Sequence, residues 1–188
     1  MIQDNLLLFT GTSNGATATI ASSAYADLPT TGTQRSSNIV DLGLIGGIPA
    51  SAVGGGGARD IGIGDKPALK FVARNLTAWS ATATVQLLLE GAPDAGANTP
   101  GSYTQMWASA VIPAATLAVA GIDLANVDMP RLAPLQPLPR YLRLSFVVAV
   151  TTNTVGTVQA EIVIDQDNPI ISATGYPSGY QAGVTVAN

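Results

Sequence analysis

The side chains that most often carry out catalysis are absent from this sequence. It contains no histidine and no cysteine, which excludes the commonest general base, the thiolate nucleophile and nearly all zinc sites. Only carboxylates remain as candidates. Glu161 and Asp165 stand four residues apart on one predicted strand, which separates them by about 13 Å, whereas a glycosidase pair needs about 5 to 9.5 Å. Asp60 and Asp65 flank a glycine-containing loop and are interpreted as solvated loop acids. The sequence therefore predicts a protein that is not an enzyme.

Two motifs suggest a bound cofactor or metal ion, but neither is complete. Residues 54–57 are consecutive glycines, yet a phosphate-binding loop requires a helix N-terminus and a Gly-Lys-Ser/Thr ending. Here Lys66 is followed by Pro67 and then by a predicted strand. Residues 165–168 begin with the acidic spacing of a calcium loop, but Pro169 stands where further oxygen ligands should follow. We therefore predict no cofactor and no metal ion.

Two arginines are predicted to have a structural role. Counting alternate residues back from Leu142, Arg140 falls on the face of the main predicted strand that points into the core. Arg59 stands beside Asp60, shortly after the run of four glycines. A buried arginine needs a carboxylate partner. We predict that Arg140 pairs with Asp60 or with Asp41; the alternative is that Arg140 emerges beyond the edge of the sheet.

The elements that would position these groups are arranged around residues 138–150, the longest run of β-type alternation in the chain. Its period of two predicts a half-buried central strand. A second alternating run, residues 158–165, follows a predicted turn at 151–156, and together the two runs predict a hairpin, with Glu161 facing outward. The residues predicted to point inward are Leu142, Leu144, Phe146, Val148 and Val150 in the first run and Val158, Ala160, Ile162 and Ile164 in the second.

The rest of the chain reads as short strands without a secure helix. This pattern predicts an all-β fold, an antiparallel β-sandwich with jelly-roll topology. We expect one sandwich domain over residues 1–168, with an N-terminal arm at 1–9, and a C-terminal tail at 169–188. The other expected elements are a strand or arm at 5–10, a loop or edge segment at 12–34, strands at 38–42, 68–75, 82–90, 102–112 and 119–124, a long glycine-rich loop at 43–64 and an extended crossover at 129–139.

The composition predicts an unusually neutral surface. The chain has 188 residues, of which 47% are hydrophobic and 11% are charged, against about 25% charged in an average soluble domain. So few charges leave much of the surface to Thr, Ser, Ala and Gly, and we expect part of it to be covered by partners. The alternative is a neutral β-surface without a special partner.

The charge also limits where the protein acts. A net charge of −4 with scattered basic residues argues against binding nucleic acid. The opening Met-Ile-Gln-Asp-Asn carries an acid where a signal peptide would be positive, so we expect synthesis in the cytoplasm without export. The longest uncharged run, residues 95–122, is broken by prolines and polar residues, so no membrane association is predicted.

Several segments together resemble the capsid cement, or decoration, proteins of short-tailed bacteriophages. They are Asn-Ile-Val-Asp-Leu-Gly at 38–43, Arg-Asp-Ile-Gly-Ile-Gly-Asp at 59–65, Pro-Arg-Tyr-Leu-Arg-Leu at 139–144, the run 158–165, and the opening Met-Ile-Gln-Asp-Asn-Leu-Leu-Leu. The resemblance extends from residue 1 to about 168, and it is lost at 11–34, 45–57 and after 170.

The resemblance implies a jelly-roll virion protein without enzymatic activity. Such proteins sit on the exterior of the icosahedral head and bridge neighbouring capsomers. The implied partner is the major capsid protein, and a homo-oligomer is expected, with a dimer favoured and a trimer possible. The residues expected to face partners are Met1, Ile2, Leu6, Leu7, Leu8 and Phe9 in the arm, Gly54, Gly55, Gly56 and Gly57 in the loop, and Tyr176 and Tyr180 in the tail.

A second class of function fits the same fold. A jelly-roll carbohydrate-binding module on a virion or cell surface would use an exposed aromatic platform to stack on sugar rings. Trp79 and Trp107 are the candidates for that platform. This alternative depends on the exposure of their rings.

Overall fold

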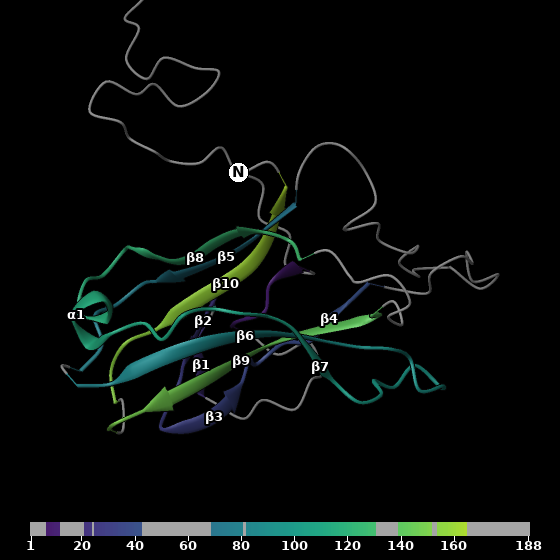
Figure 1. Cartoon of the computed structure of the whole chain (residues 1–188), viewed down its shortest axis with the longest axis horizontal. Helices are drawn as coiled ribbons and strands as arrows, with labels where there is room; N and C mark the ends of the chain where they lie inside the picture. Colours follow the sequence, from purple (N-terminus) through teal and green to yellow (C-terminus); the bar gives the residue numbers. More distant parts are fainter. Residues whose placement is uncertain are drawn as a thin grey trace, which may run out of the picture.

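The chain folds into two antiparallel sheets that pack face to face (Figure 1). The computed structural model describes residues 7–11, 21–23, 25–42, 69–80, 82–130, 139–151 and 154–164. The first sheet has the order β1-β2-β10-β5-β8, and the second has the order β3-β9-β6-β7, with β4 also pairing with β9. The first contains β1 (Ala21–Ser23), β2 (Ala26–Leu28), β10 (Val158–Ile164), β5 (Leu69–Asn75) and β8 (Asp123–Asp128); the second contains β3 (Gly32–Arg35), β4 (Val40–Asp41), β9 (Tyr141–Ala149), β6 (Thr84–Ala92) and β7 (Thr104–Ala108).

The order of pairing is that of a jelly roll. Strand β2 pairs with β10, β3 with β9, β5 with β8 and β6 with β7, so the chain winds as one long hairpin folded over itself. Each of the connections β2–β3, β5–β6, β7–β8 and β9–β10 joins one sheet to the other. The predicted all-β antiparallel sandwich is confirmed.

The core lies between the sheets and is centred on β9, as its alternation predicts. Leu142, Leu144 and Phe146 are completely buried, and β9 is flanked by β3 and β4 on one side and by β6 on the other. Phe71 of β5 meets Phe9 edge to face, with ring centroids 5.8 Å apart. Because these rings come from the start of the chain and from the first sheet, the core joins segments that are distant in sequence.

The predicted hairpin between residues 138–150 and 158–165 is wrong. The first run forms β9 in the second sheet, whereas the second run forms β10, which pairs with β5 over its whole length in the first sheet. A period of two specifies which face of a strand is buried but not which strand is its neighbour. Residues 150–157 therefore carry the chain across the sandwich instead of turning it within one sheet.

Two side chains lie on the opposite side from the one predicted. Val150, predicted to point inward, is 73% exposed, because β9 ends at Ala149 and Val150 has φ of 82°. Glu161, predicted to face outward into solvent, is 6% exposed, because Leu8 forms a β-bridge directly opposite it. The N-terminal segment thus covers a position that the alternation alone assigns to water.

The strand predicted at 119–124 begins later than expected, and a short helix that was not predicted precedes it. Helix α1 (Ala114–Leu117) follows Pro113, and strand β8 begins only at Asp123. Proline suits the start of a helix because it has no N–H to leave unpaired there, and Leu117 is fully buried. No helix in the described part of the chain is long and apolar enough to span a membrane.

Candidate interaction surfaces

The last three residues of the predicted N-terminal arm belong to the core and not to a partner-facing surface. Leu7, Leu8 and Phe9 are 7%, 4% and 0% exposed. The backbone N–H of Phe9 donates to the carbonyl of Ala160 in β10 at 2.8 Å. Their prediction as partner-contacting residues is therefore wrong. The segment lies beside β10, and its apolar side chains are buried by the sandwich of this same chain.

A buried carboxylate fixes the N-terminal segment in place. Asp27 of β2 is fully buried, and it accepts hydrogen bonds from the backbone N–H groups of Gly11 at 3.1 Å and Ser37 at 2.8 Å. The Ser37 hydroxyl in turn donates to the carbonyl of Gly11 at 2.6 Å. Burial raises the pKa of Asp27, although these hydrogen bonds oppose the shift. Asp27 is therefore a structural group that joins three segments of the chain.

The other residues predicted to face partners lie outside the described parts of the chain. These are Met1, Ile2, Leu6, Gly54, Gly55, Gly56, Gly57, Tyr176 and Tyr180, and the same holds for Arg59, Asp60 and the predicted tail at 169–188.

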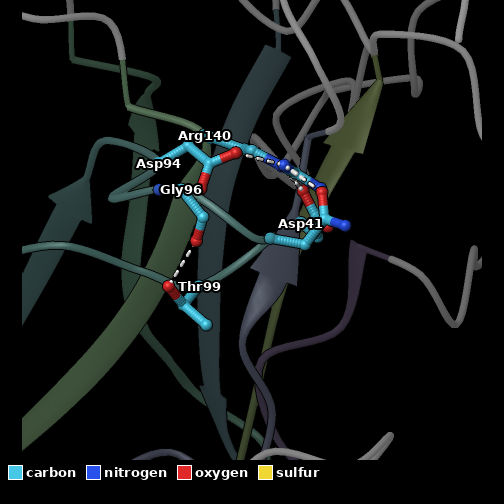
Figure 2. Close-up of polar contacts among 6 residues, drawn as sticks. Asp41, Asp94, Gly96, Thr99 and Arg140 are labelled. Atoms are coloured by element: carbon cyan, nitrogen blue, oxygen red, sulfur yellow. Dashed lines mark hydrogen bonds and ion pairs between the residues drawn. The ribbon is translucent and has the colours of Figure 1, made fainter.

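Arg140 is the centre of an ionic network at the end of the sandwich where β9 begins (Figure 2). Of its two predicted partners, Asp41 lies in contact: Nε and Nη2 of Arg140 donate to the two Asp41 carboxylate oxygens at 2.8 and 3.0 Å. Nη1 donates to Asp94 at 2.6 Å and to Asn98 at 2.8 Å. The guanidinium also lies 4.9 Å from the ring centroid of Tyr141. Sequence reasoning missed Asp94 and Asn98, because they approach only when the β6–β7 connection folds back over β9.

That connection is itself held in a fixed shape. The Gly96 N–H donates to Asp94 at 2.9 Å, and the Thr99 hydroxyl donates to the Gly96 carbonyl at 2.6 Å (Figure 2). The Gly96 hydrogen bond, followed by the bond from Arg140, lowers the pKa of Asp94. Asn98 adopts φ of 59°, a left-handed conformation that asparagine tolerates well. The network therefore joins β4, the β6–β7 connection and β9 into one unit.

A second ionic cluster covers the outer face of the second sheet. Arg143 Nε donates to Glu90 at 2.7 Å, and the Ser145 hydroxyl donates to the same Glu90 oxygen at 2.6 Å. The guanidinium of Arg143 stacks 3.7 Å from the ring centroid of Tyr103. Burial would raise the pKa of Glu90, but the two hydrogen bonds outweigh it, so the pKa is lowered. Arg143 of β9 and Arg140, directly before β9, thus both pair with carboxylates of the sandwich.

The remaining chemical candidates do not gather into a site. Within the described ranges, no three acidic side chains lie close enough together to hold a metal ion. Trp79 is 4% exposed and belongs to the core, while Trp107 is partly buried and packs edge to face on Phe71 with ring centroids 5.6 Å apart. The Trp79 ring therefore cannot serve as the flat platform of a carbohydrate-binding module, whereas the Trp107 ring is only partly covered.

The end of the sandwich opposite the Arg140 network has a different chemistry. Here lie the connections β2–β3, β5–β6, β7–β8 and β9–β10, whose described residues are 29–31, 76–80, 82–83, 109–122, 150–151 and 154–157. None of these residues is Asp, Glu, Lys or Arg. We call this surface the uncharged loop end; in Figure 1 it is the side marked by α1.

Hydrogen bonds and packing join the connections of the uncharged loop end to one another. Leu76 N–H donates to the Thr157 carbonyl at 2.8 Å, and Trp79 N–H donates to the Leu117 carbonyl at 3.0 Å. The Trp79 ring lies beneath them and leaves no space for a side chain at Gly156. The described parts of the β5–β6, β7–β8 and β9–β10 connections therefore pack against one another.

The sequence indicates this surface, but the uncharged residues that form it are far apart along the chain. Residues 76–89, 95–122 and 144–160 are uncharged runs, and the second is the run that is too broken by prolines and polar residues to span a membrane. Alternate connections of a jelly roll meet at the same end, which brings the uncharged runs together in space.

The fold and these surfaces define an all-β jelly-roll domain in which Arg74, Arg140 and Arg143 are bound to carboxylates of the same chain. The chain belongs to the Bbp16 family, whose model matches residues 26–162. No curated protein matches the chain.

Proposed function

We propose that this protein is a capsid cement protein, which binds the outside of an icosahedral phage head and bridges neighbouring capsomers. Its partner is the major capsid protein, and it acts as a homo-oligomer on the exterior of the virion. It performs no catalysis in this role.

One observation carries the proposal: the described arginines that form ion pairs bind carboxylates of this same chain. Arg140 holds Asp41 and Asp94, Arg143 holds Glu90, and Arg74 holds Asp123 at 2.8 Å. Pairs of this kind fix the sandwich and keep these three arginines from offering a free positive charge to a partner. A rigid framework with few charged residues, 11% of the chain, suits a protein that works by contact with other folded proteins.

The role also fits the energetics of a lattice. An icosahedral shell offers many equivalent positions, and each bound copy links subunits that are already close together. Modest single contacts then add up to tight binding, because every contact after the first is effectively intramolecular. The resemblance of residues 1–168 to cement proteins of short-tailed phages points the same way.

Co-sedimentation tests the proposal. Purified protein is mixed with DNA-filled heads of the phage that encodes the chain, from which the native copies have been removed. The heads are pelleted and the bound copies per head are counted. Saturable binding together with greater resistance of the heads to heat is the expected result. Protein that stays in the supernatant at all concentrations would refute the proposal.

A further inference from the structure

We propose that the uncharged loop end is the surface that docks on the shell, and that it lies against an uncharged, apolar patch of the major capsid protein. This inference rests on the proposed function and adds to it the face that makes the contact.

The connections at the two ends of the strands differ in charge, and the ion pair nearest in sequence to the uncharged connections, Arg74 with Asp123, lies in the adjoining strands β5 and β8 and is closed within itself at 2.8 Å. The end at which β9 begins holds Asp41, Asp94 and Arg140, whereas the connections at the end where β9 finishes contain no ionised side chain. Water-exposed loops normally carry many charges, since about a quarter of an average domain is charged. Four neighbouring loops without a charge are therefore a feature that calls for a physical reason.

Exposed apolar side chains concentrate on the same surface. Six large hydrophobic residues are exposed in the described part of the chain, and all except Tyr25 belong to the uncharged loop end. A cluster of this kind on a soluble domain marks a contact surface. Its members are Leu76 (37% exposed), Val111 (61%), Val119 (51%), Val150 (73%) and Val155 (53%).

The surface is also prepared for binding by its own hydrogen bonds. Thr77 and Thr157 are joined through their hydroxyls at 3.0 Å, and Thr82 and Thr151 at 2.6 Å. Asn75 donates from its side chain to the carbonyls of Leu117 and Val119, both at 2.8 Å. Loops fixed in this way lose little conformational freedom when a partner binds.

The absence of charge on the uncharged loop end indicates which class of partner can bind there. Nucleic acid requires arginine or lysine to bind its phosphates, and the uncharged loop end has neither. A charged group of a partner would lose its water here and find no counter-charge, which is unfavourable. The matching surface is therefore itself uncharged and apolar, and under the proposed function it belongs to the shell protein.

Two substitutions in the loop end and one matched control test the inference. Val111→Asp and Val155→Asp each place a carboxylate on the docking surface at a position that is more than half exposed, so the fold should persist. Tyr25→Asp places the same charge at a residue of similar exposure, 52%, in the turn between β1 and β2. Thermal unfolding followed by circular dichroism checks that the three variants remain as stable as one another.

Affinity for DNA-filled heads is then measured by co-sedimentation. We expect Val111→Asp and Val155→Asp to weaken binding at least about tenfold, because the new carboxylate is desolvated without a partner, and Tyr25→Asp to bind like the unaltered chain. Binding of the unaltered chain should change little between about 0.05 and 0.5 M NaCl, since no ion pair is formed.

The outcomes separate the inference from the proposed function. If the unaltered chain fails to bind heads, the proposed function itself is refuted. If the unaltered chain binds and both loop-end variants bind equally well, only the inference is overturned. It is also overturned if the variants lose self-association in sedimentation velocity experiments while their binding to heads is unchanged, because the surface would then join copies of this chain.

Discussion

Gly156→Ala should destabilise the protein more than the same change at Gly32, Gly96 or Gly121, which also have positive φ but have open space around an added Cβ. Gly156 has φ of 105°, and an added Cβ would lie 2.4 Å from Trp79 Cδ1 and 3.0 Å from Trp79 Cα. The backbone conformation costs a residue with a Cβ about 1–3 kcal/mol. The clash adds about 1–3 kcal/mol, because the Trp79 backbone cannot swing away as the end of a flexible side chain could.

Gly96→Ala is the matched control. Gly96 has φ of 106°, and nothing lies within 4 Å of an added Cβ. The backbone cost and the reduced entropy of the unfolded chain are the same in both variants, so they cancel in the comparison. The difference between the two losses in the free energy of unfolding is therefore the contact with Trp79 alone, about 1–3 kcal/mol.

Urea unfolding of both variants measures this difference. In a Trp107→Phe background the fluorescence of Trp79 reports separately on the packing beneath the loop end, and its emission should shift to the red only in Gly156→Ala. The two variants could instead lose the same free energy of unfolding within about 0.5 kcal/mol and leave the Trp79 emission unchanged. That result would refute the close packing of Trp79 against Gly156 beneath the uncharged loop end.

Three further changes are predicted. Arg140→Met removes the bonds to two carboxylates that can partly rehydrate, and should lower the free energy of urea unfolding by about 1–3 kcal/mol; an unchanged value would contradict the structural role of the network. Glu90 has a pKa lowered from 4.5, so its ionised form stabilises the fold above that pH, and the contribution disappears as the pH falls through the lowered pKa. The stability difference between the unaltered chain and Glu90→Gln should therefore be largest near neutral pH and shrink in acid; a constant difference would contradict this sign. Val150→Gly relieves a β-branched residue at φ of 82°, so stability should stay the same or rise by up to about 2 kcal/mol, and a clear loss would contradict it.

The sequence predicted which face of its main strand is buried, because the alternation of apolar and polar residues follows burial directly. The alternation in residues 138–150 correctly placed Leu142, Leu144, Phe146 and Val148 in the core. The same pattern could not reveal that β10 pairs with β5, because strands in both sheets of a sandwich show the same period. It failed at Val150 for a related reason: a strand's end is set by where its neighbours stop and not by its own composition.

Sequence reasoning missed part of the ionic network because its members are far apart in the chain and meet only in the folded protein. Asp41 and Arg140 lie 99 residues apart, and their pairing was suggested only because a buried arginine needs a carboxylate. Asp94 and Asn98 carry no local sign of this role. They reach Arg140 because antiparallel pairing of β6 with β9 places Ala92 opposite Tyr141, next to the network.

The sequence by itself determined the class of the fold and the chemistry that the protein lacks, because residue types and a period of two are local properties of the chain. Histidine and cysteine are absent wherever the chain folds, and alternating strands without long helices form sandwiches. Only the tertiary structure decided which ends of those strands meet. In the jelly roll, alternate connections lie at the same end of the sandwich. The ionic network around Arg140 is therefore at one end, and the uncharged connections are at the other.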